Sequence, residues 1–141
     1  MDFDPETAYN FGLLPLCAWR EAQNQGYLGM LGVCWNVLNR AAKPGWWGKD
    51  VPSCILHPFQ YSSFNPGDPN SKKFPQSTDP PAVQQAWQDA LRAAHDAFTG
   101  AVPDPTNGSL FYHDSSIATP SVWGPVVQTA QIGTLTFYKL V

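Results

Sequence analysis

The chain carries few charged side chains and no marked excess of either sign. Its 141 residues include 8 Lys and Arg against 11 Asp and Glu, which gives a net charge of −3. A protein that binds nucleic acid presents a concentrated basic surface, and here only Lys72 and Lys73 form a small basic pair. We therefore expect no nucleic-acid partner.

The sequence also lacks a long hydrophobic run. No stretch approaches the ~20 apolar residues that span a bilayer. The acidic start, Met1-Asp2-Phe3-Asp4, has neither the basic region nor the apolar region of a signal peptide. We expect that the chain does not insert into a membrane and that it is made in the cytoplasm.

Cysteine is scarce as well. Cys17, Cys34 and Cys54 are an odd number, so at least one thiol of a monomer is free. Cys17 and Cys34 fall within apolar helical patterns and should pack as small hydrophobic side chains. This usage indicates folding in a reducing compartment.

Apolar and aromatic residues are abundant by contrast. The chain is 43% hydrophobic and contains 14 Pro, 6 Trp and 8 Phe. A chain of this length and composition can bury one core, so we expect a single domain over residues 1–141. Most aromatic side chains belong in that core, although those that line a groove commonly stack on sugars or bases.

The sequence predicts three helices in the N-terminal part of the chain. Asp4 and Pro5 resemble an N-cap and first turn, and Gly12 is expected to end that helix. A second helix is expected at about 14–23, with Pro15 in its first turn, and a third at about 27–42. Gly29 and Gly32 weaken the third helix, which suggests that another backbone packs close to it.

After these three helices, the sequence predicts an irregular region, a further long helix and a small sheet. Residues 45–78 are rich in turn formers, with one short helix at 52–56, and so long an irregular region is usually functional, with a surface connector as the alternative. A clear helix runs from 78–80 to Gly100, with Val83, Trp87, Ala90, Ala94 and Ala97 as its buried stripe. Segments 109–113 and 132–138 favour strands that pair into a small sheet. The fold class is α+β and mainly helical.

Glu21 is the candidate functional acid. It ends one apolar segment, close to the start of the next helix and flanked by Trp19 and Ala22. Partial desolvation there would raise the pKa of its carboxyl group toward the range of a proton donor at neutral pH. On pattern alone, a solvated acid at a helix end is the commoner situation.

Four segments in order resemble the spore-cortex-lytic (SleB-type) family of cell-wall hydrolases. They cover the chain from about Leu14 to its C-terminus. They are Glu21-Ala22 with Gly29 and Val37-Leu38-Asn39-Arg40; Gln60-Tyr61-Ser62; Asp104-Pro105-Thr106-Asn107-Gly108-Ser109-Leu110-Phe111-Tyr112-His113; and Thr129-Ala130-Gln131-Ile132-Gly133 with Phe137-Tyr138.

The resemblance implies a lysozyme-like fold of the lytic transglycosylase type. It implies cleavage of the glycan strand of peptidoglycan, at the bond between N-acetylmuramic acid and N-acetylglucosamine, by one glutamate. Non-hydrolytic transglycosylation is favoured, with hydrolysis as a muramidase as the other product chemistry. The implied acid, then base, is Glu21, and the implied glycan-binding residues are Gln60, Tyr61, Tyr112, His113, Asn39 and Thr129. Asp68 and Asp114 are weaker candidates for a second carboxylate, and strand alternation suggests that only one of Tyr112 and His113 lines the groove.

We expect no metal ion or cofactor, and we expect the chain to be a monomer. With no export signal expected, the chain reads as a phage-type lysis enzyme made in the host cytoplasm, or as a wall-opening enzyme carried in a virion.

The chain departs from the family pattern in two places. In the first, Gln23-Asn24 replaces the usual Arg-Gly and Gln25 stands where the family has a second acid; in the second, Met30 stands where the family often has Gln. A binding or virion module that kept the fold without turnover is therefore the alternative function. A Cys/His peptidase and a zinc site are weaker readings, because the cysteines look buried and His57, His95 and His113 are widely spaced.

Overall fold

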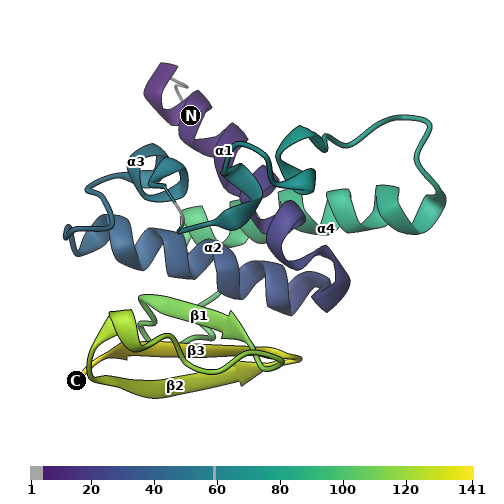
Figure 1. The fold of residues 1–141 in the computed structure, drawn as a ribbon. Coiled ribbons are helices and arrows are strands. Elements are labelled where there is room, and N and C mark those ends of the chain that lie inside the picture. Colours follow the sequence, from purple (N-terminus) through teal and green to yellow (C-terminus); the bar gives the residue numbers. More distant parts are fainter. Residues whose placement is uncertain (1–4, 59) are drawn as a thin grey trace.

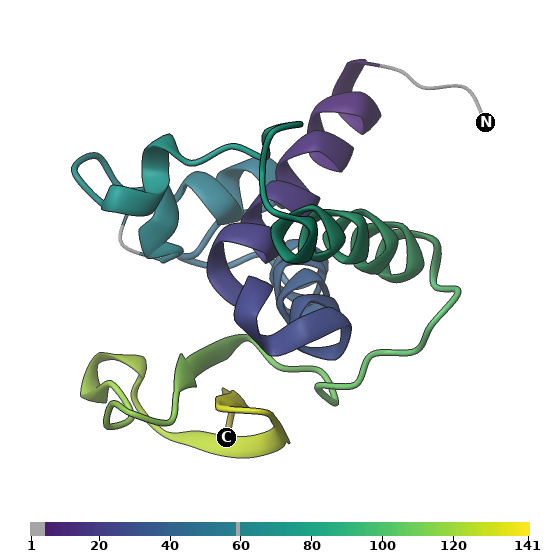
Figure 2. The same ribbon diagram turned by 90° about the vertical axis from the view of Figure 1, so that its right-hand side faces the viewer.

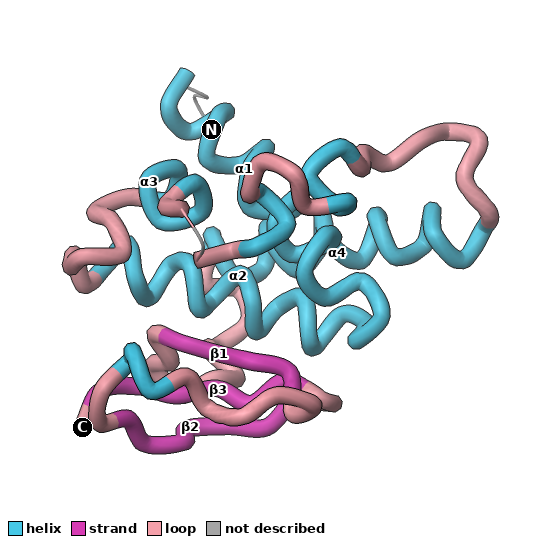
Figure 3. The backbone as a smooth tube through the Cα atoms, viewed as in Figure 1, coloured by secondary structure: helices cyan, strands magenta, loops and turns pink. Residues whose placement is uncertain are grey.

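A layer of helices lies on a small antiparallel sheet in the computed structural model, which describes residues 5–58 and 60–141 (Figure 1). The long helices are α1 (Pro5–Ala22), α2 (Gly26–Ala42) and α4 (Pro81–Thr99), and α2 packs against the other two. Figure 3 separates the helical part from the three strands, and the view turned by 90° again places the sheet on one side of the helices (Figure 2). The predicted class, mainly helical with a small β element, is confirmed.

Helix α1 is one helix where we predicted two. It runs through Gly12 and Pro15 without a break, so the expected boundary there is wrong. A proline inside a helix costs roughly 3 kcal/mol. The face that carries Leu14, Cys17 and Ala18 is fully buried, and burying a leucine alone stabilises by about 1.5–3 kcal/mol. The expected Asp4 cap lies outside the described residues.

Helix α2 confirms the prediction for residues 27–42 to within one residue. We also expected another backbone to pack close to its glycines, and this expectation is wrong. A Cβ on Gly32 would lie 2.8 Å from Cζ of Phe137, and one on Gly29 would lie 2.3 Å from Cβ of Gln25. The close partners are therefore side chains. Gly32 makes room for a ring of the sheet, which lets β3 pack directly under α2.

The remaining helices follow their sequence signals. Helix α3 (Val51–Leu56) is capped by Asp50, whose carboxylate accepts a hydrogen bond from the Ser53 N–H at 2.8 Å. Two short 3₁₀ helices, η2 (Ser62–Phe64) and η3 (Pro69–Lys72), occupy the irregular region after it. Gly100 ends α4 in the left-handed conformation at φ 71°, as predicted. Small side chains, Ala90, Ala93, Ala94 and Ala97, form the buried face of α4.

The sheet has the strand order β1-β3-β2, with β1 (Phe111–Asp114), β2 (Val126–Ile132) and β3 (Leu135–Leu140) all antiparallel. The predicted pairing of the 109–113 segment with the C-terminal segment is confirmed. The predicted strand 132–138 is confirmed over residues 135–138, which lie in β3, but its start is wrong because Ile132 ends β2 and Gly133 turns the chain at φ 56°. Strand β2 escaped prediction because most of its side chains are exposed or half-buried and show no apolar alternation.

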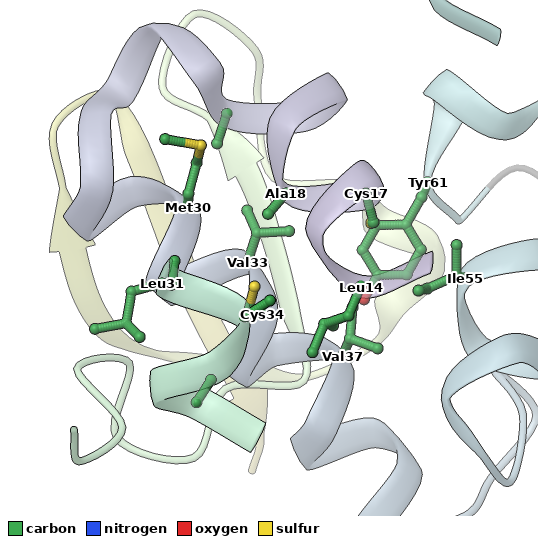
Figure 4. Close-up of a cluster of buried hydrophobic side chains, with 14 of the residues drawn as sticks. Leu14, Cys17, Ala18, Met30, Leu31, Val33, Cys34, Val37, Ile55 and Tyr61 are labelled. Carbon is green, nitrogen blue, oxygen red and sulfur yellow. The ribbon is translucent and has the colours of Figure 1, made fainter. Parts of the chain in front are cut away.

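One hydrophobic core joins the helices to the inner face of the sheet. Figure 4 shows part of it, including Cys17, Cys34 and the ring of Tyr61. All three cysteines are unpaired and buried, which confirms that Cys17 and Cys34 act as small hydrophobic side chains. In the described part of the chain, no helix is both long and apolar enough to cross a membrane.

Candidate active site

Glu21 lies on the last turn of α1, half-buried and facing strand β1. The Tyr112 hydroxyl on β1 donates a hydrogen bond to Glu21 Oε1 at 2.6 Å. Ser63 on η2 approaches the same carboxyl group, while its Oγ is buried and has no partner of ordinary hydrogen-bond geometry in the described chain. Three separate elements therefore converge on one carboxyl group.

Burial raises the pKa of the Glu21 carboxyl group above its ordinary value. Hydrogen bonds from Tyr112 and Ser63 favour the ionised form and offset part of this rise, while the negative charge of Asp68 adds to it. Burial also raises the pKa of the Tyr112 phenol well above its usual range. The phenol therefore stays protonated and acts as a hydrogen-bond donor to Glu21 at all physiological pH values.

Glu21 opens into a hollow of about 330 Å³, which we call the acid hollow. Its walls come from the α1–α2 junction, the 60–62 turn and the sheet. The lining residues are Glu21, Asn24, Gln25, Gln60, Ser62, Tyr112, Asp114 and Leu135. This is the arrangement that the sequence predicted: an acid beside the glutamine–tyrosine turn and the aromatic strand.

A second hollow of about 420 Å³ adjoins the first, because Gln60 and Tyr112 line both. We call it the aromatic hollow, since Trp46 and Trp123 border it together with prolines and Val122. Because they share these two residues, we refer to the two hollows together as the groove. A groove of this kind can hold more than one unit of a linear polymer.

Gln60 stands at the junction of the two hollows, and Arg40 fixes its orientation. The Arg40 Nη1 donates to Gln60 Oε1 at 3.2 Å, and the Arg40 Nε donates to the Leu110 carbonyl. Arg40 is only 4% exposed. The prediction did not assign Arg40 a role, although its place on the buried stripe after Val33 and Val37 was a signal for a buried charge.

Tyr61 lies largely in the core, although it also borders the aromatic hollow. Its side chain is 1% exposed, and its hydroxyl donates to Asn36 Oδ1 at 2.9 Å. Its ring lies 6.2 Å from that of Tyr112. Tyr61 therefore supports Tyr112 and the wall of the aromatic hollow, and a direct glycan contact through it stays a prediction.

Tyr112 and His113 point to opposite faces of β1, as the alternation predicted. His113 is 8% exposed, and its ring lies 5.9 Å from that of Trp123 and 5.2 Å from that of Tyr138, which also contact each other. Its Nδ1 faces the Asp114 carbonyl at 2.7 Å and therefore carries the proton in a neutral ring, while Nε2 meets the Tyr138 hydroxyl at 2.9 Å. His113 does not line the acid hollow, so its place is behind the aromatic wall.

Asn39 and Thr129 are not brought to Glu21 either. The Asn39 amide donates to Asp104 Oδ2 at 2.9 Å and to the Ser109 carbonyl at 3.1 Å, so it fastens the 104–109 loop to α2. Thr129 lies on β2, where its carbonyl accepts a hydrogen bond from Asn107. Neither residue lines either hollow, and the structure offers no direct glycan contact for them.

Arg20, next to Glu21 in sequence, holds the wall opposite the sheet. Its guanidinium carbon lies 4.6 Å from the centre of the Phe64 ring and 4.8 Å from that of Phe74. Its Nε donates to the Lys73 carbonyl at 3.0 Å. The segment fastened in this way includes Ser62 and Ser63, which face Glu21 and its hollow. Sequence reasoning missed this contact because the two rings are distant in the chain.

The two departures from the family pattern have different places. Gln25 lines the acid hollow, and its Oε1 accepts a hydrogen bond from the Thr134 N–H in the β2–β3 turn at 3.0 Å. Met30 is completely buried in the core. The change at position 25 therefore touches the groove, as does the one at Asn24, which also lines the acid hollow, whereas the change at Met30 does not.

Asp68 and Asp114, the candidate second carboxylates, are both engaged locally. Asp68 caps η3 by accepting from the Asn70 N–H at 2.8 Å. Asp114 lines the acid hollow, where hydrogen bonds from Thr134 and Ser116 lower the pKa of its carboxyl group. The site thus pairs one carboxyl group with a raised pKa and one with a lowered pKa.

The competing chemistries find little support in the described residues. Burial raises the pKa values of the Cys17, Cys34 and Cys54 thiols, to about 11 for Cys54, which disfavours the thiolate that a cysteine nucleophile needs. Over residues 5–58 and 60–141, no three His, Cys, Asp or Glu side chains gather in a metal-binding arrangement.

Comparison with known proteins agrees with this geometry. Residues 24–138 match the model of the cell wall hydrolase family, a match that begins just after Glu21. The catalytic domain of the germination-specific lytic transglycosylase SleB from Bacillus anthracis is 24% identical, with a TM-score of 0.69 over 92% of this chain and 93% of that one. The catalytic domain of the Bacillus cereus SleB protein is also 24% identical, with a TM-score of 0.71 over 94% and 91%.

No individual curated protein is a significant sequence match. The family match nevertheless covers most of the chain, and the two solved structures share its lysozyme-like fold, which confirms both the resemblance and the predicted fold. The chain therefore belongs to the cell wall hydrolase family and is of the SleB type.

Proposed function

We propose that the chain cleaves the glycan strand of peptidoglycan between N-acetylmuramic acid and N-acetylglucosamine, with Glu21 as its only acid/base group. Family membership supports peptidoglycan cleavage in general. The identity of the cleaved bond, of the acid/base residue and of the products goes beyond family membership and is proposed here from the site. We favour a lytic transglycosylase, which ends the glycan in a 1,6-anhydro ring.

One observation carries the assignment. The Glu21 carboxyl group is half-buried in a hollow, its pKa is raised by burial, and a protonated tyrosine donates to it at 2.6 Å. A general acid must be protonated near neutral pH and must hold its proton at a defined position. Tyr112 occupies Oε1, which leaves Oε2 as the oxygen that carries the proton.

The reaction then runs in two proton transfers. Glu21 donates its proton to the glycosidic oxygen as the bond from C1 to that oxygen breaks, and an oxocarbenium-like centre develops at C1. The resulting Glu21 carboxylate then takes the proton of the 6-hydroxyl group of the same sugar as its oxygen attacks C1. The net change is intramolecular, so the enzyme returns to its starting state and no water is consumed.

The charge distribution of the groove supports a single-acid scheme. The carboxylate formed in the first step lies beside the developing positive charge and stabilises it electrostatically. Asp114, whose pKa is lowered, stays ionised in the same hollow and adds to this field. Asp114 is held by hydrogen bonds from Thr134 and the Ser116 N–H, at 2.7 Å and 2.9 Å, so it is not free to act as a second proton carrier.

The test is digestion of purified peptidoglycan, with the products identified by mass spectrometry. Anhydromuropeptides support the transglycosylase, and new reducing ends without an anhydro ring support a muramidase that uses the same acid. Freed stem peptides with intact glycan strands would overturn the proposal. Binding to the wall without any product would support the alternative, a non-catalytic binding or virion module.

The biological setting of a phage-type lysis enzyme is a separate part of the proposal. It is independent of the chemistry of the site. The measurement is lysis of a bacterial culture that expresses the chain, with and without a protein that permeabilises the inner membrane. Lysis that needs the permeabilising partner supports the setting, and lysis without it would count against it.

A further inference from the structure

A third hollow, of about 400 Å³, lies where the chain passes from η3 to α4, beside α1 (Figure 1). We call it the lysine hollow, because Lys72 and Lys73 border it. None of its lining residues borders the acid hollow or the aromatic hollow, so it is a site apart from the groove that contains Glu21. The lining residues are Trp19, Gln23, Lys72, Lys73, Phe74, Gln76, Asp79 and Val83.

The lysine hollow gathers positive charge that the described residues do not balance. Lys72 and Lys73 are both exposed there, and the guanidinium carbon of Arg20 lies 4.8 Å from the centre of the Phe74 ring, which lines the hollow. None of these three cations forms an ion pair with another described residue. Among the described residues that line the hollow, Asp79 supplies the one carboxylate. Three cations against one carboxylate make this surface attractive to an anionic group.

Two buried donors on α1 lack an acceptor beside the same hollow. The Trp19 side chain lines the hollow and is 4% exposed, and its Nε1 has no hydrogen-bond partner in the described chain. The Nη2 of Arg20 is buried and unpartnered in the same way. A buried donor without an acceptor costs about 1–3 kcal/mol, and the large majority of such groups in folded proteins are paired. A ligand that brings oxygen acceptors to this surface would offset that cost.

A smaller hollow of about 220 Å³ continues the lysine hollow, because Gln76 and Asp79 line both. We call it the glutamine hollow, and its lining residues are Pro75, Gln76, Ser77, Asp79, Gln84, Trp87 and Gln88. The Gln76 Nε2 donates to the Phe74 carbonyl at 3.2 Å. The Gln84 Nε2 donates to the Asp79 carbonyl at 2.8 Å. Because a carbonyl only accepts, both amides are oriented by their nitrogens, and their Oε1 atoms are left as hydrogen-bond acceptors.

The lysine hollow and the acid hollow meet at the short helix η1 (Gln23–Gln25). Gln23 lines the lysine hollow, and its neighbour Asn24 lines the acid hollow. No residue of η1 is buried, so this boundary is open to a ligand. Consecutive Cα atoms lie about 3.8 Å apart, and an extended peptide of about four residues spans up to ~14 Å. A short peptide branch of a glycan held beside Glu21 can therefore cross η1 and enter the lysine hollow.

An acidic peptide has the chemistry that matches these two hollows. Its carboxylates complement the cations, and its backbone N–H groups can donate to the fixed glutamine oxygens. We infer that the lysine hollow and the glutamine hollow bind the acidic stem peptide of peptidoglycan, with a stem carboxylate on Lys72 and Lys73. A phosphodiester polymer would also meet the cations, but it has no backbone N–H groups for the glutamine oxygens. The inference rests on the proposed function, because the stem peptide is a branch of the strand that Glu21 cleaves, and it adds a preference that the cleavage chemistry does not require.

The first experiment compares three forms of one preparation of soluble glycan strands: native, stripped of stem peptides by an amidase, and native with the stem carboxylates converted to amides. For the wild-type chain we expect KM on stripped strands to be about tenfold higher than on native strands, with kcat within about twofold, which is the effect of one charge-assisted hydrogen bond. The carboxylate-amidated strands should behave like the stripped ones. Equal KM values on all three forms would overturn the peptide site while leaving the proposed function in place.

Substitution of the two lysines locates the effect. The double variant Lys72→Gln/Lys73→Gln changes exposed side chains, and we expect its KM values on native and stripped strands to differ by no more than about twofold, since its charge contacts with the peptide are lost. The matched control is Lys43→Gln/Lys139→Gln, which removes the same charge from exposed positions outside all four hollows and should keep the wild-type preference. A full wild-type preference in Lys72→Gln/Lys73→Gln would overturn the assignment.

Binding separates the peptide site from turnover. The Glu21→Gln variant is titrated by calorimetry with native strands, with stripped strands and with a soluble poly(glycerol phosphate). Preferential binding of native strands supports the peptide site even if the wild-type chain cleaves nothing, in which case the proposed function alone has failed. Equal or undetectable binding of native and stripped strands would overturn the peptide site whatever the wild-type activity is. Tighter binding of the poly(glycerol phosphate) than of native strands would also overturn it, because the cations would then serve a phosphodiester polymer.

Discussion

Glu21→Gln should abolish most activity and at the same time stabilise the fold, which is an unusual pair of effects for one substitution. Glutamine has the shape of glutamate, and its oxygen can still accept the 2.6 Å hydrogen bond from Tyr112. The variant lacks only the proton and the charge. Losing a general acid typically costs about 10²–10⁴ in rate, and losing a buried charge removes a desolvation penalty.

The sign of the stability effect follows from the pKa shift. Burial raises the pKa of Glu21 in the folded chain above the ordinary value of 4.5, so the folded state binds the proton more tightly than the unfolded state does. The contribution of Glu21 to stability is full below pH 4.5 and is lost as the pH rises through the folded pKa. Each pH unit between the two pKa values costs the wild-type chain about 1.4 kcal/mol, or roughly 5 °C in Tm.

The assay is thermal or urea unfolding of wild type and Glu21→Gln across pH 3.5–8. The two should be equally stable at the acid end, and the variant should become more stable as the pH rises. Asp114→Asn is the matched control in the same hollow, and because the pKa of Asp114 is lowered by hydrogen bonds it should instead lose stability at neutral pH. A stability difference for Glu21→Gln that is constant with pH, or full activity of the variant, would refute the reasoning.

Three further predictions concern the surroundings of the acid and the packing beneath it. Tyr112→Phe removes a donor that favours the carboxylate, so the pKa of Glu21 should rise further and the alkaline limb of the kcat/KM profile should move to higher pH, with a lower kcat; an unmoved profile would contradict this. Arg20→Met should loosen the wall that its two phenylalanine rings and the Lys73 carbonyl hold, admit water to Glu21 and move the same limb to lower pH, and Arg20→Lys should restore part of the wild-type profile. Gly32→Ala places a Cβ 2.8 Å from the Phe137 ring and should destabilise by about 1–3 kcal/mol in urea unfolding, whereas Gly12→Ala, with no neighbour within 4 Å, should not destabilise.

Local signals were sufficient where one element decides its own structure. Apolar residues spaced four and three apart predicted α2, and turn-forming residues predicted α3 and the end of α4 at Gly100. These boundaries were predictable because they depend on residues that are neighbours in the chain. The same reasoning failed in α1, where Gly12 and Pro15 are poor helix residues. The helix continues through them because tertiary burial of one face outweighs local propensity, and that burial is not visible in a window of ten residues.

The candidate acid likewise has features that the sequence predicts and features that only tertiary contacts determine. Composition and position marked Glu21 as an acid near a helix junction, and the family resemblance raised it above a solvated side chain. What burial does to its pKa, and which donor meets it, depended on Tyr112, 91 residues away in the chain. Asn39 and Thr129 were included in the predicted site because of their motifs, yet they line neither hollow and support the scaffold instead. A motif identifies a residue as important but does not show which way its side chain points.

The sequence by itself determined the fold class, most of the helices, the burial of the cysteines and the family, and it singled out Glu21 as the candidate acid, since all of these are read from residue types and their spacing. The tertiary structure alone decided that α1 is unbroken, that Arg20 and Arg40 hold the walls, and that an acid hollow and an aromatic hollow share Gln60 and Tyr112. The physical reason is that a pKa, an amide orientation and a groove arise from atoms that approach one another through packing across the whole chain, and no local pattern specifies those distances.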